Sequence, residues 1–506
     1  MENDNNSNEE ENENGENNGE NEMNEEEDIL IPNRPELEEI KEQTITLLFP
    51  SENSPKHART LFFKNNPEVS QIKPVENLKI EELTIKDKKF MILYKAYKNL
   101  PLCLSGPMEY NNIIRSKLYK NTNIIWKLLQ MDKMNPLLKQ LNKYQRFNHF
   151  PFTWQLCRKD DLYTNYTKMK KKFPDDYNFM PETYILPKDF ELISKQLKEY
   201  NQFDTTNLLL IKPVASSKCR GVRILMDTST VPEKGIITHY ISEPHLINKK
   251  KYDLRIYLLI TGFAPLKIYL YDNGFVRFCP EDYTLDPDKM TNKSIHLTNY
   301  YMNKIKNTDK ENEKELENIK TNDLTNYWSL YALKGYFTEQ KLDFKTVWER
   351  IKDMLIKTVL SIMDIALPTL KGYNLTSCNL FELYGVDILL DKKLNPWLME
   401  VNLNPSLDCD TDLDKSIKSK LLTDVFNIIG IVPFSHDGRD KPLEKQNYYK
   451  TKIDEAVTES LCEFERPSGG FERIFPTEKN IDIYKKFIAA PGIENCTLWD
   501  VMQKRK

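Results

Sequence analysis

Residues 382–407, ELYGVDILLDKKLNPWLMEVNLNPSL, decide the fold, because a short polar break joins two apolar runs there. Residues 384–391 and 396–402 predict two strands, since both runs are rich in aliphatic and aromatic side chains. Residues 392–395 are polar and precede Pro396, which is typical of a short hairpin loop. The stretch therefore predicts an antiparallel hairpin.

Each strand of this hairpin carries a carboxylate among apolar neighbours. Asp387 lies in the first run and Glu400 in the second, and Asn402 shares the face of Glu400 because side chains alternate along a strand. A symmetric loop places Asp387 opposite Glu400, where two bare carboxylates at roughly 5 Å would repel each other. Oxygen-only ligands favour Mg²⁺, which removes this repulsion. The alternative is a half-exposed hairpin whose acids face water, and a one-residue slip of register would separate them.

The charge of the chain is unevenly distributed. Its 506 residues are enough for two to four domains or one elaborated enzyme core. Residues 1–28 contain 13 acidic and no basic residues, whereas the remainder has nine more basic than acidic residues. We therefore expect the folded part to attract an acidic partner. The acidic tract either occupies a substrate groove or serves as a solubilising tail.

The cysteines and the hydropathy pattern describe the expected environment. Eight cysteines are scattered without CxxC spacing and form no cluster with the six histidines, which predicts free thiols and no structural zinc. The N-terminal residues do not resemble a signal peptide, and no run reaches about 18 apolar residues. These observations predict a reduced, intracellular, soluble protein without membrane insertion.

A second motif, NLLLIKPVASSKCRGVRILM at residues 207–226, places a basic loop rich in small residues between two apolar strands. Such a loop can bind phosphates through backbone N–H groups and cations, with Lys212 at the end of the first strand. It is not a Walker motif, because GxxxxGK[ST] is absent. The alternative is an ordinary surface hairpin.

Further elements are expected along the chain. Helical spacing of apolar residues predicts a helix at 347–363. Residues 413–431 are another helix candidate, and residues 159–172 predict a helix whose KMKKK run is either a solvated face or a site. Asp272-Asn273-Gly274 between residues 266–271 and 275–278 predicts a tight hairpin turn. Residues 302–325 are charged and indicate a solvated insertion, and GGFERIFP at 469–476 indicates a docking segment.

Six stretches, in order, resemble the tubulin tyrosine ligase-like family and its polyglutamylase branch. They are NHFPFTWQLCRKDDL, KPVASSKCRGV, HYISEPHLINKKKYDLRIYLLIT, GFVRF, HLTNYYMNK and FELYGVDILLDKKLNPWLMEVNLNPSLDCD, and they span roughly residues 145–432. The resemblance implies an α+β, ATP-grasp fold with antiparallel sheets around a nucleotide cleft.

The implied domains follow the chain. Residues 1–33 are a disordered acidic tract and 34–75 an irregular extension. The resemblance implies an N-terminal lobe at 76–205, a central ATP-grasp lobe at 206–245, and a C-terminal ATP-grasp lobe with the metal site at 246–434. Residues 435–506 form a C-terminal docking extension.

The resemblance also implies an ATP site. Lys212 acts on the phosphates as a catalytic residue, and residues 218–221 cover them. The implied ATP-binding residues are Lys212, Lys218, Cys219, Arg220, Gly221, Thr238, His239, Tyr240, Ile241, Lys251, Asp253, Thr298 and Asn299.

A glutamate site and a metal site complete the implied set. Arg277 binds a carboxylate of incoming L-glutamate, because guanidinium and carboxylate match as two forks, and it counts as the second catalytic residue. Tyr300 and Tyr301 line the same pocket. The implied magnesium ligands are Asp387, Glu400 and Asn402. The chain departs from the family pattern at Cys219, usually Gly, at Thr238, usually Gln, and at Tyr301, usually a small residue.

The implied reaction is ATP- and Mg²⁺-dependent ligation of glutamate chains onto glutamate side chains of acidic tubulin tails through an acyl phosphate. The expected partners are tubulin or microtubules and free L-glutamate, without nucleic acid, and the protein is expected to be a monomer. Asp387→Ala, Glu400→Gln and Asn402→Ala are expected to abolish ligation with little unfolding.

Two other functions remain open from the sequence. One is a related ligase that adds glycine or modifies a non-tubulin acidic protein, and the other is a non-catalytic microtubule-binding relative. The resemblance implies a location in the cytoplasm and cytoskeleton, with the axoneme and basal body of a cilium or flagellum as the expected sites.

Overall fold

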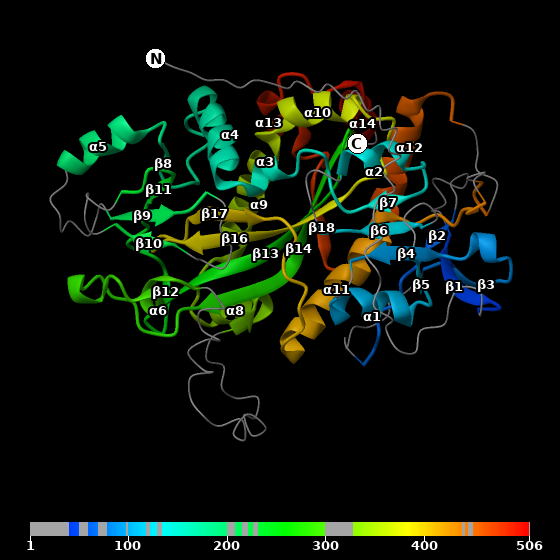
Figure 1. Ribbon diagram of the computed structural model, residues 1–506, viewed down its shortest axis with the longest axis horizontal. Coiled ribbons are helices and arrows are strands. Elements are labelled where there is room, and N and C mark those ends of the chain that lie inside the picture. Colours follow the sequence, from blue (N-terminus) through cyan, green and yellow to red (C-terminus); the bar gives the residue numbers. More distant parts are fainter. Residues whose placement is uncertain are drawn as a thin grey trace, which may run out of the picture.

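The computed structural model describes residues 40–49, 59–68, 78–97, 100–117, 122–128, 134–199, 208–214, 221–225, 231–298, 327–437, 441–443 and 449–504. The acidic tract 1–33 and the insertion 302–325 lie outside these residues. In the described part, helices and sheets are mixed, and most strand pairs are antiparallel, as expected for an α+β protein (Figure 1).

A seven-stranded antiparallel sheet forms the centre of the molecule (Figure 1). Its main order is β15-β14-β13-β16-β17, while β12 pairs with β13 and β18 pairs with β14. The strands are β12 (Leu246–Ile247), β13 (Lys250–Phe263), β14 (Leu266–Phe278), β15 (Tyr327–Ser329), β16 (Glu382–Leu390), β17 (Pro396–Asn402) and β18 (Phe471–Phe475).

The hairpin of β16 and β17 forms in the predicted register, with Asp387 directly opposite Glu400. The pairing shifts by one residue immediately afterwards, so that Ile388 faces Leu398. This bulge lies on the loop side of the two acids and leaves their pairing intact.

The predicted turn at Asp272-Asn273-Gly274 is wrong. These residues lie inside the continuous strand β14, and the connection from β13 to β14 runs through Ala264 and Pro265. The segment forms part of a bulge in β14. The pairing with β13 moves from Ile256–Gly274 directly to Leu258–Leu270, so residues 271–273 have no partner in that register. A Cβ atom on Gly274 would lie 2.3 Å from the Arg255 carbonyl oxygen, so the glycine permits close approach of two backbones rather than a turn.

Two small sheets precede the central one in the chain. The first has the antiparallel order β2-β1-β3. The second, β5-β4-β6-β7, is parallel, which differs from the expected antiparallel sheets. Their strands are β1 (Gln43–Leu48), β2 (Thr60–Leu61), β3 (Ile80–Ile85), β4 (Leu93–Ala96), β5 (Ile114–Arg115), β6 (Ile124–Trp126) and β7 (Arg146–Phe147).

A four-stranded antiparallel sheet, β10-β9-β11-β8, carries the second predicted motif. Arg223 pairs with Ile211, so β9 and β10 flank the basic loop as predicted. The strands are β8 (Thr183–Leu186), β9 (Leu209–Lys212), β10 (Arg223–Ile224) and β11 (Gly235–His239).

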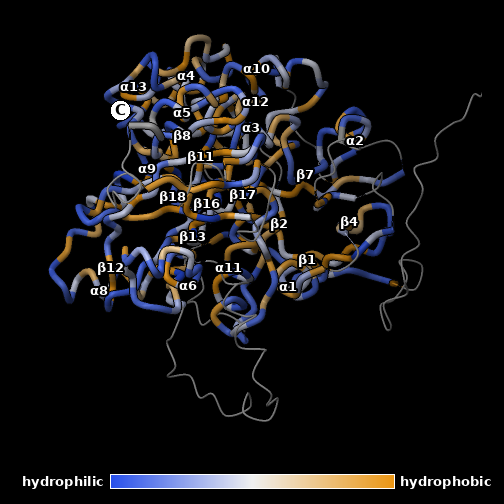
Figure 2. Tube along the Cα trace, turned by 60° about the vertical axis from the view of Figure 1, so that its left-hand side comes forward, coloured by the Kyte–Doolittle hydropathy of each residue, from blue (hydrophilic) through white to orange (hydrophobic). Residues whose placement is uncertain are grey.

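Helices cover both faces of the central sheet. Alternate residues of β13 enter two different cores: Leu254 and Ile256 pack with α9, whereas Tyr257 and Leu259 pack with α11. Figure 1 shows α10 and α14 on one side of the β13–β14 hairpin and α1 and α11 on the other, and in Figure 2 the central strands are largely hydrophobic.

The three expected helices are present. The expected helix at 347–363 is α9, the one at 413–431 is α11, and the one at 159–172 is α4. Asp343 and Thr411 cap α9 and α11 with side-chain oxygens. The α-helices are α1 (Leu102–Tyr110), α2 (Met134–Gln140), α3 (Trp154–Cys157), α4 (Lys159–Lys172), α5 (Phe190–Glu199), α6 (Lys293–His296), α8 (Leu330–Glu339), α9 (Phe344–Leu360), α10 (Met363–Lys371), α11 (Asp412–Ile429), α12 (Lys452–Glu465), α13 (Ile481–Tyr484) and α14 (Ile493–Gln503).

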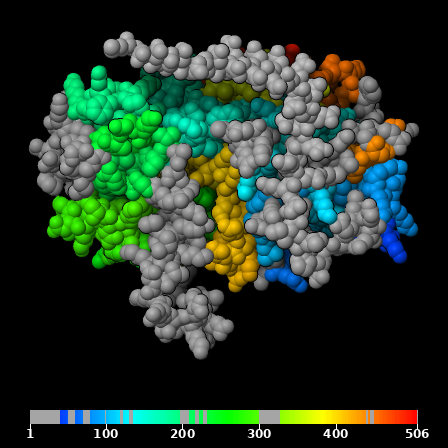
Figure 3. All heavy atoms as spheres, in the orientation of Figure 1, coloured from blue at the N-terminus to red at the C-terminus, as the bar shows by residue number. Residues whose placement is uncertain are grey.

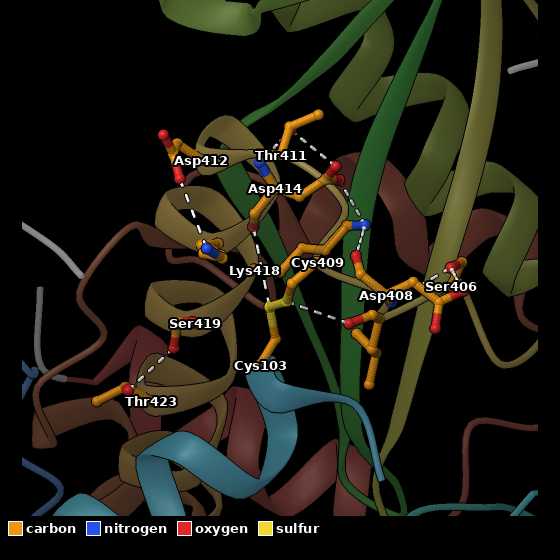
Figure 4. The surroundings of a disulfide bond; sticks show 12 residues. Cys103, Ser406, Asp408, Cys409, Thr411, Asp412, Asp414, Lys418, Ser419 and Thr423 are labelled. Carbon is orange, nitrogen blue, oxygen red and sulfur yellow. Dashed lines mark hydrogen bonds and ion pairs between the residues drawn. A yellow bond between two sulfur atoms is a disulfide. The ribbon is translucent and has the colours of Figure 1, made fainter. Parts of the chain in front are cut away.

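The cysteines differ from the expected set of free thiols. Cys103 in α1 and Cys409, shortly before α11, form a disulfide, with their Cα atoms 6.5 Å apart (Figure 4). The spacing of cysteines along the chain gave no sign of this pair, because 306 positions separate the two residues.

No helix in the described ranges is long and apolar enough to cross a membrane.

Candidate functional site

Four charged side chains from three neighbouring strands form the centre of the candidate site. Asp253 and Arg255 lie two residues apart on β13 and therefore share a face. Asp253 is paired across the sheet with Arg277 of β14, and Arg255 is paired with Asp387 of β16. The sheet register thus brings two acids and two arginines together.

These four residues form a continuous hydrogen-bonded network. Arg277 donates from Nε to Asp253 Oδ1 at 2.7 Å, and its Nη2 lies 3.0 Å from Asp387 Oδ2. Arg255 donates to both oxygens of Asp387, from Nε at 2.5 Å and from Nη2 at 3.0 Å. Each carboxylate is therefore held by the fork of a guanidinium group.

Burial and opposite charge shift the pKa values of the network in different directions. Burial raises the pKa of Asp253, although Arg277 and a hydrogen bond from Thr298 oppose that shift. Burial acts in the same direction on Asp387, but Arg255 and Arg277 outweigh it and hold the pKa of this carboxyl well below its usual range. Asp387 is consequently a carboxylate at neutral pH.

The predicted metal ligands lie next to this network. Asn402 Nδ2 lies 3.3 Å from Asp387 Oδ2, and Glu400 is cross-strand from Asp387. Lys159, the first residue of α4, lies 3.3 Å from Glu400 through its Nζ. The donor set of two carboxylates and an amide on adjacent strands fits a hard divalent cation such as Mg²⁺. Within the described residues, no group of three or more His, Cys, Asp or Glu side chains is arranged to hold a metal.

A second polar group connects the four-stranded sheet to the central sheet. Lys251 Nζ donates to the Tyr240 hydroxyl at 2.9 Å and to the His296 carbonyl at 3.0 Å. The Tyr240 hydroxyl also lies 3.0 Å from His296 Nδ1. Burial, followed by the nearby Lys251, lowers the pKa of His296 to about 4. Among the described groups, His296 Nε2 is buried without a hydrogen-bond partner.

The strand residues expected around the nucleotide lie on one sheet. Lys212 is half-buried at the end of β9, and its position is paired with Ile236 of β11. Thr238 on β11 is buried and accepts a hydrogen bond from Thr183 at 2.9 Å. At the far end of the loop, Gly221 has a φ of +76°, and a Cβ there would lie 2.8 Å from Pro213, so glycine is required.

Two further expected nucleotide residues lie at the end of β11. His239 lies 3.8 Å from Glu182, and Ile241 is half-buried just beyond the strand. The remaining expected site residues lie outside the described part of the chain; they are Lys218, Cys219, Arg220, Asn299, Tyr300 and Tyr301.

The structure brings in three residues that sequence reasoning missed: Arg255, Lys159 and His296. The sequence did contain a signal for Arg255. This arginine directly precedes the apolar run IYLLIT at residues 256–261, and a buried arginine needs a hydrogen-bonding partner. Lys159 and His296 gave no comparable signal, because their partners come from distant segments.

Comparisons with known proteins identify the family of the chain. Residues 137–439 match the model of the tubulin-tyrosine ligase family. Tubulin monoglutamylase TTLL4 of Mus musculus is 35% identical over 301 residues, which cover 59% of this chain and 24% of the relative.

Two further relatives are similar over a longer part of the chain. Tubulin polyglutamylase ttll-4 of Caenorhabditis briggsae is 32% identical over 404 residues, covering 72% of this chain and 65% of the relative. Tubulin polyglutamylase TTLL5 of Mus musculus is 31% identical over 402 residues, which cover 70% of this chain and 29% of the relative. The chain thus spans less than two thirds of the length of each of these relatives. The family match extends across all three strands of the charged network and the hairpin of the candidate metal ligands, and the chain belongs to the tubulin-tyrosine ligase family.

Proposed function

We propose that the protein is an ATP-dependent ligase that adds glutamate to glutamate side chains of acidic tubulin tails. The observation that carries the proposal is the pairing of Asp387 with Glu400, with Asn402 on the same side, inside a family-matched segment. The relatives named as tubulin glutamylases support the choice of amino acid and acceptor.

In this proposal the three lobes of an ATP-grasp fold hold the nucleotide between the four-stranded sheet and the central sheet. Lys212 contacts the phosphates from β9. Lys251 is held in place by Tyr240 and the His296 carbonyl, which fixes its ammonium group at the same junction. Asp387, Glu400 and Asn402 hold Mg²⁺, which disperses phosphate charge when it is bound.

The reaction needs no covalent nucleophile from the protein. A carboxylate of the acceptor attacks the γ-phosphate of ATP, and ADP leaves. The amine of free L-glutamate then attacks the carbonyl carbon of the acyl phosphate, which forms the amide bond and releases inorganic phosphate. Positioning and charge stabilisation supply the catalysis. Arg277 is bidentate to Asp253 through Nε and Nη2, and Nη2 also lies 3.0 Å from Asp387. The guanidinium group is therefore fixed, and Nη1, which makes none of these contacts, is the nitrogen that would meet the substrate carboxylate.

The test is incorporation of labelled amino acid into tubulin by the full chain in the presence of ATP and Mg²⁺. Labelled glutamate should be incorporated and labelled glycine should not, and mass spectrometry should locate the added residues in the tubulin tails. Glu400→Gln and Asn402→Ala should abolish incorporation while the thermal midpoint of unfolding stays close to that of the wild type.

Other results would favour the other candidate functions. Incorporation of glycine alone would replace this proposal with a glycine ligase. Binding of microtubules without any ATP turnover would replace it with a non-catalytic binding protein. Normal glutamate incorporation by both variants would contradict the assigned metal ligands. A cytoskeletal location follows from the proposed substrate.

A further inference from the structure

The disulfide connects the N-terminal region of the fold to the segment that leaves the candidate site. This segment, residues 403–411, runs from the end of β17 to the start of α11, and Cys409 lies within it (Figure 4). Cys103 belongs to α1, which packs on the same core as α11. In Figure 3, gold atoms of β17 and the start of α11 reach the surface between the green and blue parts of the molecule.

The segment 403–411 also packs against the strand that carries Asp387. Gly385 lies two positions before Asp387. A Cβ atom added to Gly385 would lie 2.9 Å from the Cβ of the buried Pro405 and 3.2 Å from Arg255 Cδ. Pro405 and the Arg255 side chain therefore both lie close to Gly385 of β16. A displacement of this segment would remove the Pro405 packing from this position of the strand that carries Asp387.

One other contact fastens the segment at its far end. Lys418 of α11 donates to the Asp408 carbonyl oxygen at 2.6 Å and lies 2.6 Å from Asp414 (Figure 4). Lys418 and the disulfide hold adjacent residues, Asp408 and Cys409. The covalent bond is the only one of these restraints that a change of redox conditions removes directly.

We propose that Cys103 and Cys409 are a site of reversible oxidative modification, whose disulfide sets how firmly residues 403–411 are held against the candidate site. Disulfides in a reducing compartment, where the proposed substrate tubulin is found, are usually transient. Of the two residues, Cys103 is fully buried and Cys409 is partly exposed, so exchange with a small molecule begins at Cys409.

The chemistry is thiol–disulfide exchange with a low-molecular-weight disulfide such as oxidised glutathione. The Cys409 thiolate attacks one sulfur of the small disulfide, forming a mixed disulfide and releasing one glutathione thiolate. The Cys103 thiolate then attacks the Cys409 sulfur and releases the second glutathione. The protein loses two protons and two electrons, and one oxidised glutathione becomes two reduced molecules.

The first experiment measures the modification itself on the full chain. The protein is equilibrated in buffers of different ratios of reduced to oxidised glutathione, free thiols are alkylated, and peptides are analysed by mass spectrometry. We expect a peptide pair joined through Cys103 and Cys409 that disappears in reducing buffer and is absent from Cys409→Ser. The control Cys496→Ser changes an exposed free cysteine and should leave the pair intact. Complete alkylation of both residues in every buffer would overturn the proposal.

The second experiment measures the consequence for the segment. Hydrogen exchange of the backbone amides in residues 403–411 should become about tenfold faster on reduction of the wild type, because a covalent restraint is lost. Cys103→Ser and Cys409→Ser should show the fast exchange in both buffers. Equal exchange in the oxidised and reduced wild type would show that the bond does not hold the segment.

Activity gives a third readout, and this readout alone rests on the proposed function. Reduction should raise the KM for ATP in the wild type and leave it unchanged in Cys409→Ser. If neither redox form incorporates glutamate, the proposed function fails, while the peptide and exchange results still decide the modification. An active enzyme whose KM is the same in both forms would refute the link to the site.

Discussion

Asp387 is a buried carboxylate held by two guanidinium groups, and this setting determines what its removal would do. Arg277 keeps Asp253 as a partner in Asp387→Ala, but Arg255 is largely buried and loses both of its hydrogen bonds to the carboxylate, so its charge is left without compensation in the interior. We expect this variant to lose about 3–5 kcal/mol of unfolding free energy. Of the three variants at the candidate metal ligands, only Glu400→Gln and Asn402→Ala should therefore cause little unfolding.

Urea denaturation checks this expectation by comparing the unfolding free energies of two separate variants, Asp387→Ala and Asn402→Ala. Asn402 is half-buried and makes one weak contact with Asp387, so its replacement should change the unfolding free energy by only about 1 kcal/mol. Equal stability of the two variants would show that the arginines find other partners.

His296 gives a prediction for the dependence of stability on pH. Its pKa is about 4 in the folded protein, below the ordinary value of 6.5, because the ring is buried and near Lys251. As the pH falls from about 6.5 to about 4, His296 becomes protonated in the unfolded chain but stays neutral in the folded protein. The free energy of unfolding therefore decreases over this range. His296→Gln should lack this part of the decrease in denaturation curves recorded from pH 7 to pH 4. An identical pH profile for the two proteins would count against the buried, neutral imidazole.

Single residues of the site were partly predictable. The acids Asp387 and Glu400 stand out because each interrupts an apolar strand, and period-two alternation then decides their register. The partners Arg255 and Lys159 could not be assigned, because nothing in a sequence says which strand or helix will lie beside another. A cation within a buried strand shows only that a partner exists.

Among the elements, the pair β13 and β14 depends on one close approach of two backbones. A Cβ on Gly274 would lie 2.3 Å from the Arg255 carbonyl oxygen, so Gly274→Ala should force the strands apart. We expect a loss of about 1–3 kcal/mol and a lower thermal midpoint. Gly335→Ala in α8 is the matched control, since nothing lies within 4 Å of its added Cβ and alanine favours a helix. Similar midpoints for both variants would contradict this account.

The same segment shows why local signals mislead. Asn-Gly and Asp-Asn-Gly sequences favour tight turns because glycine tolerates unusual backbone angles. In β14 the glycine is instead required by the neighbouring strand, which a local pattern does not reveal. The helices α4, α9 and α11 were predictable because their helix-forming signals are local, and in α9 and α11 these include a side-chain N-cap.

At the scale of the whole molecule, a buried ion pair fastens α12 to the central sheet. Lys267 of β14 lies 2.7 Å from Glu463, and both side chains are almost wholly buried. Thr261 and Tyr269 donate to the same carboxylate, at 2.5 and 2.8 Å. Lys267→Met alone leaves this carboxylate without its cation and should cost about 3–5 kcal/mol.

A double-mutant cycle tests this attachment. Glu463→Gln keeps an oxygen for the two hydroxyl donors and removes the charge, so adding it to Lys267→Met should restore part of the lost stability. The control Lys485→Met breaks an exposed pair with Asp482 and should cost about 1 kcal/mol at most. Additive losses in the cycle would mean that the two residues do not act as a pair.

The pairing of β18 with β14 has a consequence for biosynthesis. Residues 268–271 of β14 pair with residues 471–475, which leave the ribosome much later. Until then, one edge of β14 presents unpaired N–H and C=O groups, the kind of edge that recruits strands from other chains. The nascent chain should therefore need protection by a chaperone over this interval, and aggregation should increase when translation pauses before codon 471.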